Sequence, residues 1–400
     1  MLKDIQPAPA DAIMGLTADF REDTNPNKIN LGVGVYQDSS GKTPLLESVV
    51  EAEQIILQNE KSKAYLPIPG SPEYGRSVRT LLFGREDSRV DSGVAVTSHT
   101  PGGTGALRVG ADLLRRFYPE SKVWLSEPTW ANHKGIFPSA GFDLESYPYY
   151  DPETHGLDFE AMRAQLEKVP ADDIVLLHAC CHNPSGVDIS DEQWNVVAEI
   201  ARDRGWVPFL DFAYQGFRRG LDQDAAGLRI LADAGVECLV ASSFSKNFSL
   251  YNDRVGALTL LLDERQKAEA AFSHLKKVIR TNYSNPPAHG GLIVNTILND
   301  ARLREMWAGE VENMRQRITR MRRLFVEKMR EYCPEHDFSF IEQQGGMFSF
   351  SGLTSNQVEY LRRERSIYIV GSGRINTAGI LESNIDYLCE SIKQALDQFE

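Results

Sequence analysis

The stretch ECLVASSFSK, residues 237–246, joins an apolar run to a polar ending. The apolar part predicts a buried strand, and Lys246 follows it among serines, with Arg254 eight residues further along. Burial disfavours the charged form of a lysine, so its pKa falls and its amine becomes nucleophilic. Hydroxyl groups and an arginine are suited to binding a phosphate. The segment therefore predicts a lysine that forms a Schiff base with a phosphate-bearing aldehyde, although a lysine considered alone is more often a solvated surface charge.

Three other apolar runs precede this one and have the same character. They are VWLSEP (123–128), DIVLLHACC (173–181) and WVPFLDF (206–212). Helical patterns lie between them, for example in DEQWNVVAEIARDRG (191–205), where we expect Asp191 to be the N-cap and Gly205 to end the helix. Strands that alternate with helices predict an α/β layer with a largely parallel sheet between about residues 100 and 260.

The last quarter of the chain has a different pattern. Residues 302–332 predict one long, charged amphipathic helix. FSFIEQQGGMFSFSG (338–352) and IYIVGSGRINTAG (367–379) predict a short antiparallel sheet after it. These segments indicate a second, smaller domain near the C-terminus. The pattern alone does not assign the first 45 residues to either domain.

Length and composition limit the function. A chain of 400 residues predicts two domains, and its net charge of −13 argues against binding to nucleic acid or to an anionic membrane. The five cysteines include no C-x-x-C pair, so we expect reduced thiols and no metal site of that type. The N-terminus has no apolar leader segment, and no apolar run reaches about 18 residues. These features favour a cytoplasmic protein.

Polar side chains follow the predicted strands where those strands end. In an open α/β sheet, ligands bind at the carboxyl ends of the strands. Asn183 comes after the second run, and Asp211 and Tyr214 come at the end of the third. Gly102, Gly103 and Thr104 begin a predicted helix, whose free N–H groups attract anions. Considered singly, these residues are more often turns, helix caps or packed aromatic rings.

Together the same residues supply every group that a pyridine cofactor with an aldehyde and a phosphate requires. Asp211 can pair with the ring nitrogen, and Asn183 and Tyr214 can bind the phenolic oxygen. Lys246 can bind the aldehyde. The predicted phosphate ligands are Gly103, Thr104, Ser243, Ser245 and Arg254.

The chain resembles the class I aminotransferases, the pyridoxal-phosphate enzymes of the aspartate and aromatic aminotransferase group. The resemblance covers nearly all of the chain and rests on the strings NLGVGVY, PGGTGALRVGAD, PTWANH, LLHACCHNPSG, DFAYQGF, SFSKNFSLYNDRVG, NYSNPP, GMFSFSG and SGRINTAG. It implies the fold type I of these transferases, an α/β fold. A large domain (46–310) would have a mostly parallel sheet flanked by helices. Residues 1–45, as an N-terminal arm, and residues 311–400 would form a smaller α+β domain.

The resemblance also implies a role for particular residues. Lys246 is similar to the lysine that bonds to pyridoxal 5'-phosphate, and Arg374 to the arginine that holds the substrate α-carboxylate. Arg280 resembles an arginine that meets a distal carboxylate across the interface of a homodimer with shared active sites, and Tyr65 resembles a tyrosine that reaches the neighbouring subunit's phosphate. Further implied contacts are Gly102 with the phosphate, Trp130 stacked on the cofactor, Gly34, Trp130 and Asn183 with the substrate, and His133 and His178 behind the cofactor ligands.

The implied reaction passes the amino group of aspartate to 2-oxoglutarate by a ping-pong route through pyridoxamine phosphate. An aromatic aminotransferase, or dual specificity, is the nearest alternative. A lyase or decarboxylase on the same scaffold is a further one, which Arg280 disfavours. A cofactor-binding regulator would need a basic DNA-binding module, and no such segment precedes residue 30. The chain departs from the family pattern at Ser185, at Asp253 and at the pair Arg218 and Arg219. We interpret the two arginines as solvated surface charges.

Overall fold

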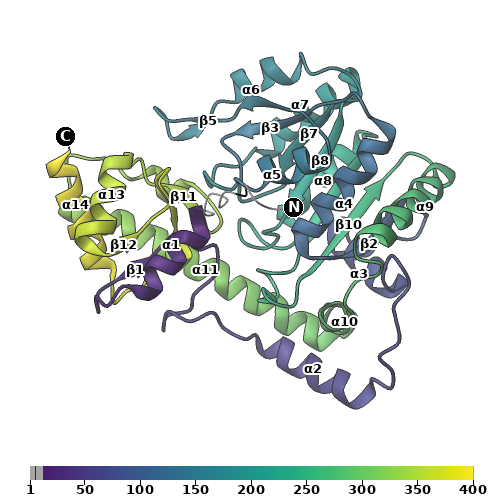
Figure 1. Cartoon of the computed structure of the whole chain (residues 1–400), viewed down its shortest axis with the longest axis horizontal. Helices are drawn as coiled ribbons and strands as arrows, with labels where there is room; N and C mark the ends of the chain where they lie inside the picture. Colours follow the sequence, from purple (N-terminus) through teal and green to yellow (C-terminus); the bar gives the residue numbers. More distant parts are fainter. Residues whose placement is uncertain (1–4, 6–11, 400) are drawn as a thin grey trace.

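The computed structural model describes residue 5 and residues 12–399, so most of the first eleven residues of the predicted N-terminal arm lie outside the described residues. A seven-stranded sheet of order β2-β10-β9-β8-β7-β3-β4 forms its centre (Figure 1). Only β10 runs antiparallel to its neighbours, so the mostly parallel sheet is confirmed. Its strands are β2 (Ala95–Pro101), β3 (Val123–Glu127), β4 (Leu144–Pro148), β7 (Ile174–His178), β8 (Val207–Phe212), β9 (Cys238–Ser243) and β10 (Val255–Leu261).

The four apolar runs of the sequence coincide with β3, β7, β8 and β9. Every residue of β7, β9 and β10 is buried, because helices cover both faces of the sheet. The helices before and around the sheet are α1 (Ala12–Glu22), α2 (Glu47–Asn59), α3 (Pro72–Phe83), α4 (Gly102–Phe117), α5 (His133–Ser139), α6 (Phe159–Leu166), α7 (Asp191–Arg204), α8 (Ala226–Asp233), α9 (Arg265–Asn282) and α10 (Ala288–Asn299). A small hairpin, β5 (Tyr150–Asp151) with β6 (Gly156–Leu157), lies at the edge of this layer.

Helix α7 begins one residue earlier than expected. Ser190, not Asp191, is the N-cap: its hydroxyl accepts the N–H of Gln193, whose side chain accepts the Ser190 N–H in return. Asp191 is instead the first helical residue, where its carboxylate pairs with Arg219. Both residue types are good caps, and the glutamine three residues after the serine decides between them. The predicted end at Gly205 is confirmed, with a left-handed φ of 74°.

The C-terminal elements follow the predicted long helix, α11 (Ala301–Tyr332). Strands β11 (Phe348–Phe350) and β13 (Arg374–Asn376) form the expected antiparallel pair. Two details of the prediction are wrong: Phe340–Gln343 is helix α12, and β12 (Ile367–Tyr368) pairs in parallel with β1 (Ile29–Asn30). Short apolar runs do not distinguish strand from helix, and the partner of β12 lies more than 300 residues away in the sequence. Helices α13 (Ser355–Arg365) and α14 (Ile385–Gln398) complete the chain.

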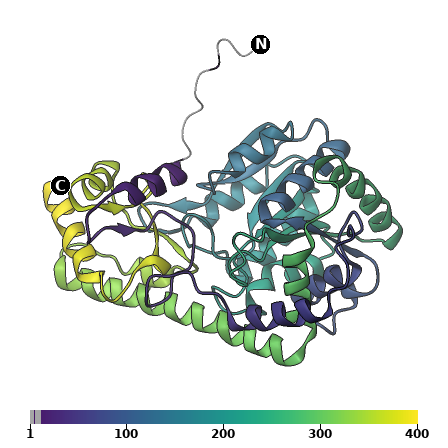
Figure 2. The same ribbon diagram turned by 60° about the horizontal axis from the view of Figure 1, so that its bottom comes forward.

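Two hydrophobic clusters cover the faces of the central sheet, and a third is separate from it. The separate cluster joins Ile29 and Leu31 to side chains between Met321 and Leu396. Figures 1 and 2 show the corresponding arrangement, with α1 and β1 beside the C-terminal elements and α11 running from them to α10. Along α11 the packing changes between Ile318, in a sheet cluster, and Met321, in the separate one.

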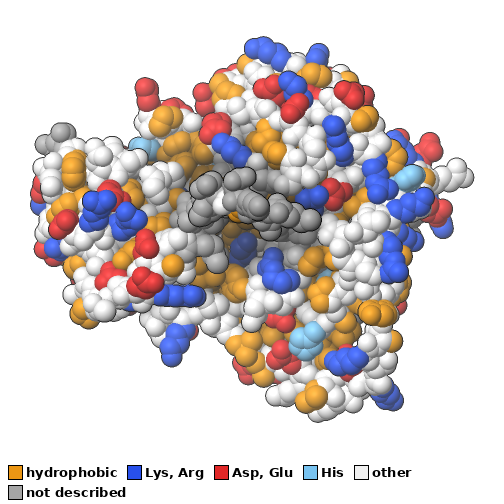
Figure 3. All heavy atoms as spheres, in the orientation of Figure 1, with side chains coloured by type: hydrophobic (Ala, Val, Ile, Leu, Met, Phe, Trp, Pro, Cys, Tyr) orange, Lys and Arg blue, Asp and Glu red, His pale blue; other side chains and the backbone are white. Residues whose placement is uncertain are grey.

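Charged side chains of both signs are interspersed on the face that Figure 3 shows. Within the part of the chain that the structure describes, no helix is both long enough and apolar enough to cross a membrane.

Candidate active site

A cavity of about 250 Å³ opens at the carboxyl ends of the parallel strands. Polar side chains from the ends of β7, β8 and β9 meet there, as the sheet geometry predicts. The cavity brings together twelve of the predicted site residues: Gly34, Gly103, Thr104, Trp130, Asn183, Asp211, Tyr214, Ser243, Ser245, Lys246, Arg254 and Arg374.

Lys246 lies three residues after β9 and points its amine at the Tyr214 ring, 4.6 Å from the ring centroid. Burial is the main cause that lowers the pKa of Lys246, Asp211 opposes the fall, and Arg254 adds to it, so that the resulting pKa is about 8. A substantial fraction of this amine is therefore neutral near pH 8, as a nucleophile or a proton acceptor requires.

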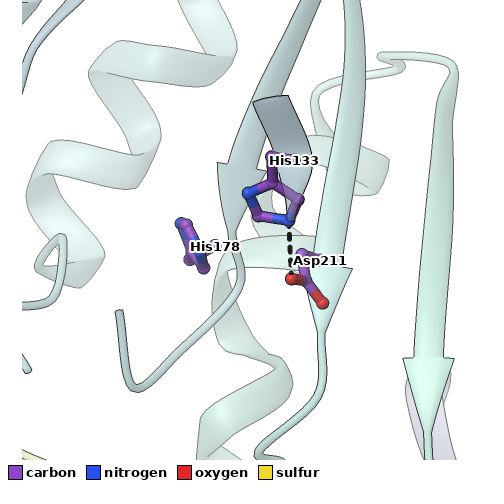
Figure 4. A group of neighbouring side chains, drawn as sticks. All are labelled: His133, His178 and Asp211. Carbon is purple, nitrogen blue, oxygen red and sulfur yellow. Dashed lines mark hydrogen bonds and ion pairs between the residues drawn. The ribbon is translucent and has the colours of Figure 1, made fainter. Parts of the chain in front are cut away.

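Asp211 stands at the end of β8 and is almost fully buried. His133 Nε2 lies 3.1 Å from Asp211 Oδ2 (Figure 4). His133 Nδ1 lies 2.8 Å from the Thr129 hydroxyl. A carboxylate accepts, so His133 donates from Nε2 and accepts the Thr129 proton at Nδ1. Burial alone would raise the pKa of Asp211, but the hydrogen bond from His133 and nearby positive charge hold it below its ordinary value. The cavity thus contains a carboxylate that stays ionised.

His178 lies beside this pair, with its ring centroid 5.4 Å from that of His133 (Figure 4). Neither of its ring nitrogens has a hydrogen-bond partner within the described residues. Burial lowers the pKa of His178 to about 3, so the ring is neutral. His133, His178 and Asp211 together offer donor atoms within 4.8 Å of one another, a set that also suits a divalent metal. The hydrogen bond from His133 Nε2 to Asp211 Oδ2 already occupies one of these potential ligand atoms on each of the two residues.

The N-terminus of α4 faces the side chains after β9. Gly102 has a φ of 75°, and a Cβ there would lie 2.4 Å from Arg254 Nη2. A Cβ on Gly103 would lie 2.9 Å from the Ser243 Cβ. Glycine is therefore required at both positions, and it leaves the backbone N–H groups of the first helical turn accessible. Ser245 lies 3.2 Å from both Ser243 Oγ and Arg254 Nη1, which completes a cradle for a dianion.

Arg374, the first residue of β13, also lines the cavity. The guanidinium is almost fully buried, stacks on Phe348 at 4.4 Å from the ring centroid, and lies 3.5 Å from Asn183 Oδ1. It also donates to the carbonyl of Gly32, whereas its Nε has no partner in the described part of the chain. Gly34 lies beside it, where a Cβ would approach the Phe348 ring to 2.9 Å. A buried guanidinium with a free donor is suited to binding a carboxylate.

Three predicted residues do not line this cavity: Gly102, which is next to Gly103 at the start of α4, Tyr65 and Arg280. Tyr65 is 93% exposed, and Arg280 is an exposed residue near the end of α9 that donates to the Ser284 hydroxyl. Conversely, the cavity contains Tyr251 and Phe348, which the sequence does not mark as site residues. Tyr251 lies in the quoted string SFSKNFSLYNDRVG, between Lys246 and Arg254, and that position was the available signal. Nothing in the local pattern around Phe348 distinguishes it from a core aromatic residue.

The residues present fit a pyridine ring that carries a phosphate and an aldehyde. An ionised, buried carboxylate suits a protonated ring nitrogen, and the side chains of Tyr214 and Asn183 can donate to a phenolic oxygen. The glycine and serine cradle around Gly103 suits the phosphate, and the Lys246 amine suits the aldehyde.

Comparison with known proteins agrees with this chemistry. The model of the family "Aminotransferase class I and II" matches residues 26–392. An aspartate aminotransferase from Salmonella typhi is 53% identical over 99% of this chain and 100% of its own length. An aromatic-amino-acid aminotransferase from Burkholderia pseudomallei, covalently bound to pyridoxal phosphate, superposes with a TM-score of 0.97 at 48% identity over 99% of both chains. An aromatic aminotransferase from Psychrobacter sp. B6, cocrystallised with aspartic acid, gives 0.97 at 42% identity over 99% of this chain and 100% of that one. The chain belongs to the class I and II aminotransferase family and is a transaminase that uses pyridoxal phosphate.

Proposed function

We propose that this enzyme transfers the amino group of L-aspartate to 2-oxoglutarate and so produces oxaloacetate and L-glutamate. The observation that carries the proposal is the placement of Lys246, Asp211 and Arg374 around one cavity. Such a site can bind an amino acid by its carboxylate and remove the proton from its Cα. The relatives named as aspartate aminotransferases, which are 52–53% identical to this chain over nearly its full length, support aspartate as the donor.

Each side chain then has a defined task. Arg374 and Asn183 bind the α-carboxylate, and Lys246 Nζ takes the proton from the substrate Cα, which requires the neutral amine. When bound, pyridoxal phosphate supplies an electron sink for the pair of electrons that the proton leaves behind. Asp211 keeps the ring nitrogen protonated, and His133 holds Asp211 ionised. The first turn of α4, with Ser243, Ser245 and Arg254, holds the phosphate.

The distal carboxylate of aspartate needs a second cation, and we assign this role to Arg280 of a second copy of the chain. The exposure of Arg280 and of Tyr65 supports this, since both residues are free to reach a neighbouring subunit. The proposed assembly is therefore a homodimer with shared active sites. The five buried cysteines, all free, support a reducing compartment, and we propose the cytoplasm.

We also propose that residues 1–45 form an N-terminal arm and part of the small domain, residues 46–310 the large domain, and residues 311–400 the rest of the small domain. The separate hydrophobic cluster supports it, because this cluster joins Ile29 to the C-terminal residues. The change of packing between Ile318 and Met321 favours a boundary somewhat later than 310 on the long helix.

Transamination of aromatic amino acids is a second candidate activity. Trp130, Tyr251 and Phe348 line the cavity and offer apolar surface to an aromatic side chain. The 48% identical aromatic aminotransferase supports this activity, and the one cocrystallised with aspartic acid supports dual specificity.

Charge reversal at Arg280 tests the assignment of the substrate. We expect Arg280→Asp to lower kcat/KM for aspartate by at least ~10- to 100-fold, because a charge-assisted pair is worth roughly 1.5–3 kcal/mol and repulsion adds to the loss. Phenylalanine lacks the distal charge and should lose far less. Arg374→Ala should damage both donors, since both have an α-carboxylate. Equal losses for the two donors in Arg280→Asp would contradict the dicarboxylate assignment.

A further inference from the structure

Arg218 is not the solvated charge that its sequence context suggested. Its side chain is only 34% exposed, and Nε lies 3.6 Å from a carboxylate oxygen of Asp188. Its other two nitrogens donate to the backbone carbonyls of Gln343, at 2.9 Å, and Gln344, at 3.4 Å. The guanidinium therefore joins two segments that lie more than 150 residues apart in the sequence.

The first of these segments is the turn that carries Asn183. Asp188 accepts the backbone N–H groups of Cys181 and His182, each at 2.9 Å, so its carboxylate closes the turn immediately before Asn183. Burial raises the pKa of Asp188, and the nearby charge of Arg218 opposes that rise. Arg218 thus helps to keep the carboxylate that fixes this turn ionised.

The second segment leads to Arg374. Gly345 donates its N–H to the Gly186 carbonyl at 2.7 Å, and a Cβ on Gly345 would lie 1.9 Å from Arg218 Cδ. Three residues later β11 begins at Phe348, and Phe350 of that strand pairs with Arg374 of β13. The backbone that Arg218 binds is therefore continuous with the strand that positions Arg374.

We propose that Arg218 is a positioning residue for substrate binding, which fixes the segment leading to Arg374 against the turn that carries Asn183. This inference rests on the proposed function, in which Arg374 and Asn183 bind the substrate α-carboxylate. Apart from Asn183, the groups that hold the cofactor lie at the ends of β8 and β9 or begin α4, and Arg218 contacts none of these through the interactions described above.

The adjacent arginine provides a matched control. Arg219 pairs with Asp191 of α7 at 2.7 and 2.8 Å and donates to the Gln223 carbonyl. Both partners belong to the helices and loops around the central sheet. Replacing Arg219 removes the same charge from the same loop without breaking the link to residues 343–345.

The test uses holoenzyme and 2-methylaspartate, an amino acid that has no Cα proton to transfer, so that cofactor absorbance reports binding without turnover. Arg218→Ala should weaken binding of this probe by about 3- to 30-fold, the usual range for coupling through packed segments. The KM values for aspartate and phenylalanine should rise by the same factor, because both donors share the α-carboxylate. Arg219→Ala should stay within about twofold of wild type. In both variants the dissociation constant for pyridoxal phosphate should change less than that for the probe, because Asn183 is only one of several cofactor ligands.

Gly345→Ala changes the other partner of the same contact. Its methyl group should displace Arg218 and weaken binding of the probe as much as Arg218→Ala does. The double variant should bind the probe no more weakly than either single variant. Additive losses, or wild-type affinity in Arg218→Ala, would overturn the inference, and so would a loss that appears only together with cofactor loss. Should Arg218→Ala not fold, Arg218→Met and Gly345→Ala decide by the same criteria. A wild-type enzyme that binds neither the probe nor aspartate would contradict the proposed function and this inference with it.

Discussion

At the residue scale, the Lys246 amine depends on its surroundings for its reactivity. Burial lowers its pKa to about 8 from an ordinary value of 10.5, and Asp211 is the main group that opposes the fall. The neutral fraction rises with pH through the pKa. In the protein freed of cofactor, acylation of Lys246 should therefore reach half its maximal rate near pH 8, measured by mass spectrometry of the peptide that contains it. Asp211→Asn should move this midpoint to lower pH. A midpoint near 10.5 would contradict the burial that the structure shows.

The roles of residues at strand ends could be predicted from the sequence, and others could not. Lys246, Asp211 and Asn183 follow recognisable apolar runs, and the geometry of a parallel sheet brings such positions together. Gly34 and Arg374 enter from segments near the two ends of the chain, so only the family resemblance indicated them. The link between Arg218 and residues 343–344 joins two loops, and no periodic pattern encodes a contact of that kind.

At the scale of elements, helix α7 offers a direct test of its capping. Ser190→Ala removes the acceptor for the Gln193 N–H and should cost about 1 kcal/mol, which corresponds to a fall of roughly 1–2 °C in Tm for a protein of this size. Ser190→Thr, which keeps the hydroxyl, should restore most of the stability. Asp191→Asn breaks only an ion pair between half-exposed groups and should cost less. A larger loss for Asp191→Asn than for Ser190→Ala, by calorimetry at equal concentration, would assign the cap to Asp191.

Long, strongly periodic elements were predicted well, and short ones were not. The predicted helix 302–332 differs from α11 by one residue, and four apolar runs became strands of the sheet. The errors fall on residues 338–343 and 367–368, where two to four residues form an element only through tertiary contacts. For example, Arg322 of α11 donates to the carbonyl of Ile341 in α12, a contact that the local sequence cannot specify.

At the scale of the whole molecule, the proposed shared sites predict complementation between inactive subunits. Lys246→Ala lacks the proton acceptor, and Arg280→Ala lacks the distal cation, so each homodimer should turn over aspartate poorly. Subunit exchange should place an intact Lys246 and the partner's intact Arg280 in one site of each heterodimer. Activity should recover to about a quarter of wild type, because half of the dimers are mixed and each has one complete site.

The matched control is exchange between Lys246→Ala and Arg374→Ala. Both residues belong to the same site, so neither site of the mixed dimer is complete and no activity should return. Absence of recovery in the Arg280 mixture, with mixed dimers demonstrated by mass, would show that Arg280 does not serve the neighbouring subunit.

Transamination in the cavity around Lys246 can be followed in a single turnover of the enzyme. Purified holoenzyme is mixed with excess L-aspartate in the absence of any oxo acid, and the products are counted per chain. We expect about one oxaloacetate per active site, with the amino group retained on the enzyme until 2-oxoglutarate is added and glutamate appears. Lys246→Ala should release none on the same timescale. Continuous formation of product without 2-oxoglutarate, or release of ammonia or carbon dioxide, would show that the enzyme is a lyase or a decarboxylase and not a transaminase.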